Sequence, residues 1–160
     1  MDLAQMKLHH YSVGVEWTGN VGMGTSHYQS YQRDHIISVA QKVDIKGSSD
    51  VCFRGNATKH NPEELLVASI ASCHMLWYLH LCAQEGIIVT HYCDNAHGTM
   101  KETIGGGGHF TEVVLKPSVT VTKDSMVKSA IRLHQEAHKL CFIANSLNFP
   151  IKHLVEVKVE

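Results

Sequence analysis

Residues 61–84 read NPEELLVASIASCHMLWYLHLCAQ, and this stretch decides the fold class. Asn61 is a favoured N-cap, and Pro62 suits the first position of a helix. Glu64 stands where the acid of a capping box is found, and acidic residues suit the first turn. Gly86 supplies a C-terminal stop. The stretch therefore predicts one long, largely apolar helix that ends near residue 85.

The interior of this helix, residues 65–84, contains no Asp, Glu, Lys or Arg. Its length is just enough to cross a bilayer. Polar side chains interrupt it, however, and the chain offers neither a second span nor aromatic and basic flanks. A helix that is apolar on all sides is normally buried. Because a domain of this size buries such a helix with difficulty, the pattern predicts a core helix covered by a second copy of the chain, and no membrane.

Length and composition restrict the class of protein further. The 160 residues suit one domain spanning 1–160. The formal charge of -1 gives no electrostatic reason to expect nucleic acid or an anionic membrane as a partner. Residues 1–10 lack the basic and apolar regions of a secretory signal. Five cysteines, an odd number, fit poorly with a secreted disulfide framework. We therefore expect a cytoplasmic protein with free thiols.

The rest of the chain alternates between strands and one further helix. Turn residues mark a loop over 20–30 and a turn at 46–50. The four glycines at 105–108 indicate a mobile hairpin turn. They are not a phosphate-binding loop, because they neither lead into Gly-Lys-Ser/Thr nor open a helix. A second helix is predicted from 124 to about 140. Strands are predicted at 10–17, 36–39, 87–94, 98–102, 110–115, 118–122 and 150–159. This order predicts an α+β fold with two β-rich blocks around long helices.

Thirteen histidines keep a metal site open as an alternative. His134, His138 and Cys141 are spaced i, i+4 and i+7, so on a helix they fall within about 60° of one another. Two imidazoles and a thiolate are a plausible zinc set. His74 and His80 fall on opposite faces of their own helix and are not expected to extend this set. The same spacing also fits an ordinary polar helix face, or a redox-active Cys141 with incidental histidines.

The cysteines raise a separate possibility, a reactive thiol. Cys73 and Cys82 point in nearly opposite directions and stand about 13 Å apart along the helix, so they cannot form a disulfide. A reactive thiol needs a lowered pKa, usually from a nearby Arg, Lys or His. Taken alone, Cys73 is more often a small core residue. The residues by themselves leave both interpretations open.

Several motifs together resemble the OsmC/Ohr family of thiol peroxidases, named for osmotically induced protein C and organic hydroperoxide resistance protein. Asn-Pro-Glu at 61–63, with Cys73 ten residues after Glu63, is similar to the opening of the family's central helix. The segment Gln-Arg-Asp-His at 32–35 looks like the family's arginine loop. Cys141, followed by Phe-Ile-Ala-Asn-Ser, looks like its second cysteine. The resemblance covers about 11–159, including the final strand.

Two departures from the family pattern indicate a distinct subfamily. Phe142 follows the second cysteine where proline is common, and His74 follows the first where an apolar residue is common. Because consecutive helix residues point about 100° apart, we expect His74 to be a packing or interface residue and not a catalytic base. Cys52, Cys82 and Cys93 are expected to be structural thiols.

The resemblance implies an OsmC-like fold, an intertwined homodimer with active sites at its interface, and peroxide reduction without a cofactor or metal. It implies that the Cys73 thiolate attacks an organic hydroperoxide and becomes a sulfenic acid, and that Cys141 then closes a disulfide. Arg33 would hold the thiolate and polarise the peroxide, oriented by Glu63. An external dithiol, lipoyl-type or thioredoxin-like, would reduce the disulfide. A metal-binding protein and a non-catalytic OsmC-like binding protein stand as the alternatives.

Overall fold

The computed structural model describes residues 7–160. The chain divides into two compact units, which we call the N-terminal unit, ending at Pro62, and the C-terminal unit, starting at Glu63. A single domain over 1–160 stays a prediction.

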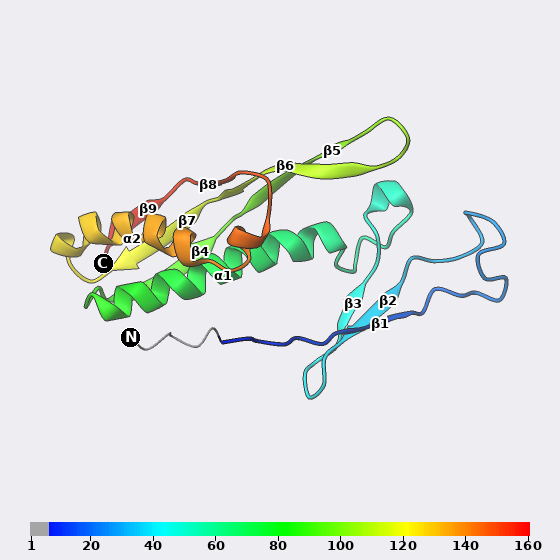
Figure 1. Cartoon of the computed structure of the whole chain (residues 1–160), viewed down its shortest axis with the longest axis horizontal. Helices are drawn as coiled ribbons and strands as arrows, with labels where there is room; N and C mark the ends of the chain where they lie inside the picture. Colours follow the sequence, from blue (N-terminus) through cyan, green and yellow to red (C-terminus); the bar gives the residue numbers. More distant parts are fainter. Residues whose placement is uncertain (1–6) are drawn as a thin grey trace. The chain divides into compact units, whose positions relative to one another are not determined.

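The N-terminal unit is built on a three-stranded antiparallel sheet in the order β1–β2–β3 (Figure 1). Its elements are β1 (Gly14–Trp17), β2 (His35–Ser38), β3 (Ile45–Gly47) and the short 3-10 helix η1 (Val51–Phe53). Asp50 caps η1, because its carboxylate accepts a hydrogen bond from the Cys52 backbone N–H at 2.8 Å. The turn predicted at 46–50 is partly wrong, since Lys46 and Gly47 pair with β2 and form the end of a strand.

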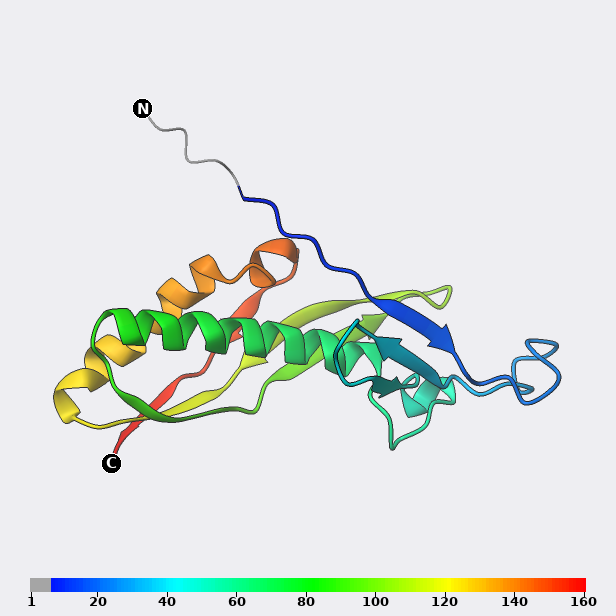
Figure 2. The same cartoon turned by 90° about the horizontal axis from the view of Figure 1, so that it is seen from below.

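The C-terminal unit packs two helices against two three-stranded sheets (Figures 1 and 2). Its helices are α1 (Pro62–Gln84), which begins at the boundary residue, and α2 (Val127–Leu140), with the short helices η2 (Asp124–Met126) and η3 (Ala144–Ser146) at either end of α2. Its strands are β4 (Val89–Asp94), β5 (His97–Glu102), β6 (Gly108–Leu115), β7 (Pro117–Val121), β8 (Ile151–His153) and β9 (Glu156–Val159). The α+β class and the long central helix are confirmed.

The predicted strand at 150–159 is wrong in one respect, because it is two strands in two sheets. β8 pairs in parallel with β6, and β9 pairs in parallel with β7. The chain passes from β6 to β7 at Lys116, whose backbone N–H leaves the ladder and donates to the Asp94 carboxylate at 2.7 Å. The closing segment follows the same break, since Leu154 donates to the Leu115 carbonyl between the two strands.

One face of α1 carries the core of the C-terminal unit. Its buried residues recur every fourth position, at Ile70, His74, Tyr78 and Cys82, which places them on one stripe. The first half of the stripe meets Val113 and Leu115 of β6, and the second half meets β7 and α2. In both views α2 lies beside the C-terminal half of α1 (Figures 1 and 2). This packing brings side chains from both helices to the same place.

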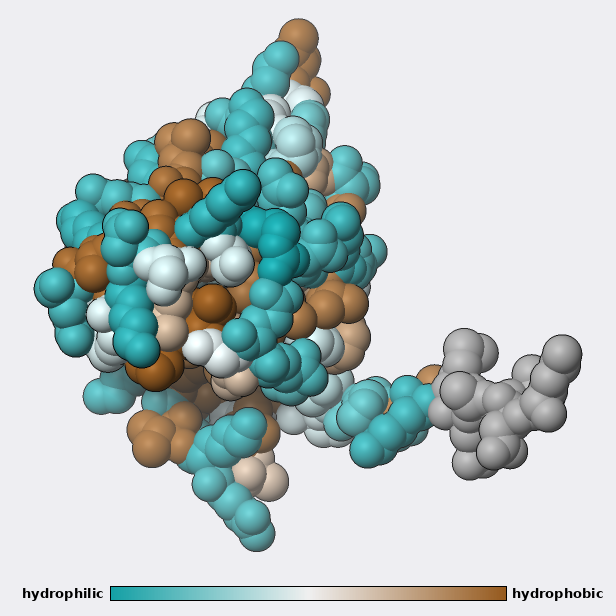
Figure 3. Space-filling view, turned by 90° about the vertical axis from the view of Figure 1, so that its left-hand side faces the viewer, coloured by the Kyte–Doolittle hydropathy of each residue, from teal (hydrophilic) through white to brown (hydrophobic). Residues whose placement is uncertain are grey.

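The remaining surface of α1 is partly buried and partly exposed within the single chain, and Leu76 is 63% exposed. By length and composition α1 could cross a membrane, and 22% of its apolar window is buried within the chain. One such helix is weak evidence for a span. Figure 3 faces the end of the C-terminal unit where α1 ends and α2 begins, and hydrophobic side chains show there among hydrophilic ones. Exposed hydrophobic residues of the elements near that end include Ile88, Ile131 and Val159.

Candidate active site

Two of the five free cysteines are brought together in the C-terminal unit. Cys73 lies half-buried on α1, and Cys141 lies at the C-terminal end of α2 with 1% exposure. Their side chains are joined by a hydrogen bond. The predicted neighbours Cys73 and Cys141 are thus in contact, although they are far apart in sequence.

The Cys141 thiol is held in a protonated state by its surroundings. Burial raises its pKa to about 11, and the hydrogen bond and charge of Cys73 act in the same direction. The backbone N–H groups of Ala144 and Ile143 act against this rise, and the Ala144 N–H lies 3.4 Å from the Cys141 sulfur. At neutral pH the Cys141 thiol is therefore protonated.

The sulfur of Cys141 owes its position to the way α2 ends. Cys141 leaves the helical conformation, and its carbonyl accepts a hydrogen bond from the Asn145 backbone N–H at 3.0 Å. The Asn145 side chain donates to the Lys139 carbonyl at 2.9 Å, which satisfies one of the last open carbonyls of the helix. The turn after α2 is thus fixed by local hydrogen bonds that hold the thiol against α1.

Arg33 lies in the N-terminal unit, where its guanidinium is bound by its own loop. It donates to the carbonyl oxygens of Tyr31 and Tyr28 at 2.5 and 2.7 Å, and it lies over both tyrosine rings at 4.1 and 4.3 Å from their centroids. These contacts hold the side chain in a defined position. Glu63 lies in the first turn of α1 and is half-buried. The proposed pairing of Arg33 with Glu63 and Cys73 joins the two units and stays a prediction.

Four histidines, which we call the histidine cluster, meet on the same two helices that carry the two cysteines and on one strand. It consists of His74 on α1, His134 and His138 on α2, and His153 on β8. His74 Nε2 and His134 Nδ1 are 2.9 Å apart and share a hydrogen bond. The His153 ring lies 4.6 Å from that of His74 and 4.8 Å from that of His138. The contact between His74 and α2 could not be predicted from the spacing along α1, because that spacing does not show which helix packs across it.

Burial keeps three of these histidines neutral. Burial, together with the neighbouring imidazoles, lowers the pKa of His74 to about 3 and those of His134 and His153 to about 4. Tyr78 stacks on the His134 ring with a centroid separation of 3.8 Å. His74 is thus a packed core residue, as its place beside Cys73 in the sequence predicts.

The alternative zinc set of His134, His138 and Cys141 does not come together among the described residues. Among residues 7–160 no group of three or more His, Cys, Asp or Glu side chains is placed to hold a metal ion. Cys141 meets Cys73, and His134 meets His74. The i, i+4, i+7 spacing correctly places the three residues along one side of α2, but each then finds a different partner.

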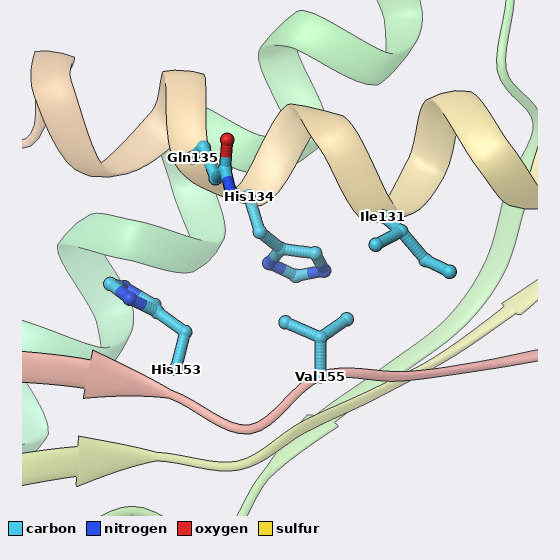
Figure 4. Close-up of a pocket in the computed structure, with 5 residues that line it drawn as sticks. All are labelled: Ile131, His134, Gln135, His153 and Val155. Atoms are coloured by element: carbon cyan, nitrogen blue, oxygen red, sulfur yellow. The ribbon is translucent and has the colours of Figure 1, made fainter.

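A cavity of about 310 Å³ opens on one side of the histidine cluster, between α2 and the segment joining β8 to β9 (Figure 4). We call it the imidazole cavity, lined by Ile131, His134, Gln135, His153 and Val155. Sequence reasoning missed both the cavity and His153. The only signal in the sequence was the high histidine content, which does not identify the members that meet.

A second, shallower cavity of about 250 Å³ lies on the outer face of α1, lined by Leu76, Trp77 and His80. The Phe142 ring, 65% exposed, packs edge-on against Trp77 with a centroid separation of 5.6 Å. The side chains of Trp77 and Phe142 thus meet on this surface. With exposed Leu76 they form an apolar patch that includes the residue following Cys141.

Comparisons with known proteins agree with the fold of this chain. The OsmC-like protein family matches residues 55–156. An OsmC-like protein of unknown function from Vibrio cholerae is 29% identical over 92% of this chain and 99% of its own, with a TM-score of 0.82. An organic hydroperoxide resistance protein from Elizabethkingia anophelis is 18% identical over 95% of this chain and 99% of its own, with a TM-score of 0.67.

A third structure, the organic hydroperoxide resistance protein OsmC from Legionella pneumophila, is 14% identical over 95% of this chain and 98% of its own, with a TM-score of 0.65. No curated protein matches the chain. The family match spans more than half of the sequence, and it includes α1, α2 and both contacting cysteines. The chain therefore belongs to the OsmC-like family.

Proposed function

We propose that the chain is a cysteine-based hydroperoxide reductase that converts organic hydroperoxides to alcohols. The observation that carries the proposal is the contact between the thiols of Cys73 and Cys141. Family membership supports a redox, peroxidase-related role. A half-exposed sulfur next to a buried one is the arrangement that an attacking thiol and a resolving thiol need.

The reaction has three balanced steps. The Cys73 thiolate attacks the distal oxygen of ROOH, the O–O bond breaks, and with one proton the products are the Cys73 sulfenic acid and ROH. The Cys141 thiol then attacks the Cys73 sulfur, which forms the disulfide and releases water. An external dithiol, lipoyl-type or thioredoxin-like, reduces the disulfide by exchange and is itself oxidised.

In this proposal Arg33 has a catalytic role and Glu63 has a positioning role. The Arg33 guanidinium would polarise the peroxide and stabilise the thiolate, and Glu63 would orient it through a bidentate pair. The stacking of Arg33 between two tyrosine rings supports a defined position for its charge. We expect Arg33→Lys, which keeps the charge but not the planar fork, to slow peroxide consumption about tenfold, a loss of about 1.4 kcal/mol. Arg54→Lys, at an exposed arginine, is the control.

We also propose that the protein acts as a homodimer in the cytoplasm, and that nucleic acid and membranes are not its partners. The apolar patch around Trp77 and Phe142 supports a second copy as the cover for α1. Sedimentation at micromolar concentration tests the dimer. A monomer that still turns over peroxide would contradict the dimer and leave the thiol chemistry standing.

The experiment that tests the function counts thiols after exposure of reduced protein to cumene hydroperoxide and, separately, hydrogen peroxide. We expect the loss of two thiols to a mapped Cys73–Cys141 disulfide, faster with the organic peroxide. Cys73→Ser should abolish the reaction, and Cys93→Ser, at an exposed cysteine, should leave it unchanged. Thiols that persist in folded wild-type protein under excess peroxide would refute the proposal and favour a non-catalytic binding protein.

A further inference from the structure

Two tyrosines of the loop before β2, Tyr28 and Tyr31, hold the guanidinium of Arg33, and we call them the tyrosine clamp. Each contacts the guanidinium twice. The central carbon of Arg33 lies over both rings, 4.3 Å from the centroid of Tyr28 and 4.1 Å from that of Tyr31. The backbone carbonyls of the same residues accept hydrogen bonds at 2.7 and 2.5 Å. Rings and carbonyls together restrict both the position and the tilt of this planar cation.

The clamp uses only part of the hydrogen-bonding capacity of Arg33. A guanidinium has five N–H donors in a fixed fork, and the two that bind the clamp carbonyls come from different terminal nitrogens. Five less two leaves three donors, of which a bidentate carboxylate takes two. The clamped guanidinium therefore keeps enough donors for a carboxylate such as Glu63 and for one reacting atom.

The Tyr31 ring is itself held in place by β1. Trp17 packs against it edge-on, with 5.8 Å between the centroids and 85° between the ring planes. The indole N–H of Trp17 donates to the Gln32 carbonyl at 2.8 Å, and the Gln32 backbone N–H donates to the Gly19 carbonyl at 2.9 Å. Gly19 permits this close approach, because a Cβ there would collide with the Gln32 carbonyl. The Tyr31 side of the clamp is thus tied to the sheet of the N-terminal unit.

The Tyr28 side of the clamp is fixed by its own loop. Ser30 Oγ accepts a hydrogen bond from the His27 backbone N–H at 3.0 Å, and the Ser30 backbone N–H donates to the His27 carbonyl at 3.0 Å. These two bonds close a turn that contains Tyr28. The Tyr28 side chain is 59% exposed. Because an exposed side chain contributes little to the core, its replacement should leave the fold intact.

We propose that Tyr28 and Tyr31 are positioning residues, which hold the Arg33 guanidinium in the orientation that stabilises the Cys73 thiolate and polarises the peroxide. This inference rests on the proposed hydroperoxide reductase function. The two rings act through Arg33, because a planar cation stabilises developing charge only when its N–H groups point at that charge. A displacement of about 1 Å at a reacting centre costs up to about a hundredfold in rate.

The test measures the first turnover of reduced full-length protein with cumene hydroperoxide, a step that needs no external dithiol. Tyr31→Leu and Tyr28→Leu each remove one ring and leave the backbone carbonyl in place, and each should slow this step at least about fivefold. Tyr31→Phe and Tyr28→Phe keep the ring and should stay within about twofold of the wild type. Tyr11→Leu, at a tyrosine that is 86% exposed, is the matched control and should also stay within about twofold.

A second background separates positioning from a merely structural role. In Arg33→Gln protein the guanidinium is absent, so adding Tyr31→Leu or Tyr28→Leu should change the remaining rate by less than about twofold. A loss of folded protein would instead slow the reaction by the same factor in both backgrounds.

Two results would overturn the inference and leave the thiol chemistry standing. One is a wild-type rate in the folded leucine variants, and the other is an equal loss of rate in the wild-type and Arg33→Gln backgrounds. Tyr28→Leu provides both readouts even if Tyr31→Leu fails to fold. Folded wild-type protein that consumes no peroxide would overturn the proposed function, and the role of the tyrosine clamp with it.

Discussion

Lowering the pH from about 7.5 to 5.5 should destabilise this protein through its histidine cluster. The pKa values of His74, His134 and His153 fall from an ordinary 6.5 to about 3, 4 and 4 in the folded state. Between these values and 6.5 the unfolded chain binds protons that the folded chain does not. The stability that the neutral imidazoles contribute is therefore present above pH 6.5 and is lost as the pH falls toward 4.

The size of the effect follows from the same values. At pH 5.5 an unfolded histidine of pKa 6.5 is about nine-tenths protonated, which lowers the free energy of the unfolded chain by about 1.4 kcal/mol. The folded histidines are almost wholly neutral at that pH. Three of them amount to about 4 kcal/mol, a large share of the roughly 5–15 kcal/mol by which domains are usually stable.

Urea unfolding at the two pH values measures this loss at one fixed protein concentration, since an oligomer's stability depends on concentration. His153→Gln removes one of the three imidazoles and should reduce the pH-dependent loss by about a third. His109→Gln, on the exposed β6 hairpin, should leave the loss unchanged. A wild-type loss below about 1 kcal/mol, or equal losses in the wild type and His153→Gln, would refute the argument.

Three further predictions concern the core, the resolving thiol and the N-terminal unit. Leu115→Ala, at a fully buried site, should lower the free energy of unfolding by about 2–5 kcal/mol. Leu76→Ala, at an exposed site, should change it by less than about 0.5 kcal/mol in monomeric protein. At pH 8 a Cys141 thiol of pKa about 11 is about one part in a thousand thiolate. Iodoacetamide should therefore label Cys141 in the folded protein far more slowly than in an unfolded control. Labelling as fast as in that control would refute the burial of Cys141. A Cβ at Gly55 would lie 1.5 Å from the Ser49 carbonyl oxygen. Gly55→Ala should therefore lower the free energy of unfolding of the N-terminal unit by more than about 1 kcal/mol, measured in thermal melts. Gly107→Ala, where the nearest contact of the added Cβ is 3.2 Å, should lower the free energy of unfolding by less.

Local sequence signals predicted the elements of this fold better than their partners. Proline and two acids at the start of α1, and Gly86 after it, mark its ends because caps act within one turn. The split of the last strand into β8 and β9 was not predictable, since alternation continues through 150–159 and only the break at Lys116 separates the two sheets. Pairing depends on the partner strand, which a local pattern does not contain.

The candidate site shows the same division. Cys73 and Cys141 were identified from the family resemblance, and their contact agrees with it. The histidine cluster was missed because its members come from α1, α2 and β8, and no spacing within one element links them. His74 was judged from its own helix, where it faces away from His80, yet its partner His134 lies on another helix.

The difference in exposure between the two cysteines assigns their order in the proposed reaction. Cys73 is half-buried and Cys141 is 1% exposed, so a peroxide from solution reaches Cys73 first. The raised pKa of Cys141 keeps that thiol protonated and therefore weakly nucleophilic toward a peroxide. The reverse order would require the buried, protonated sulfur to meet a bulky hydroperoxide. If the reaction follows the proposed route, the architecture of α1 and the turn after α2 therefore fixes which sulfur attacks and which resolves.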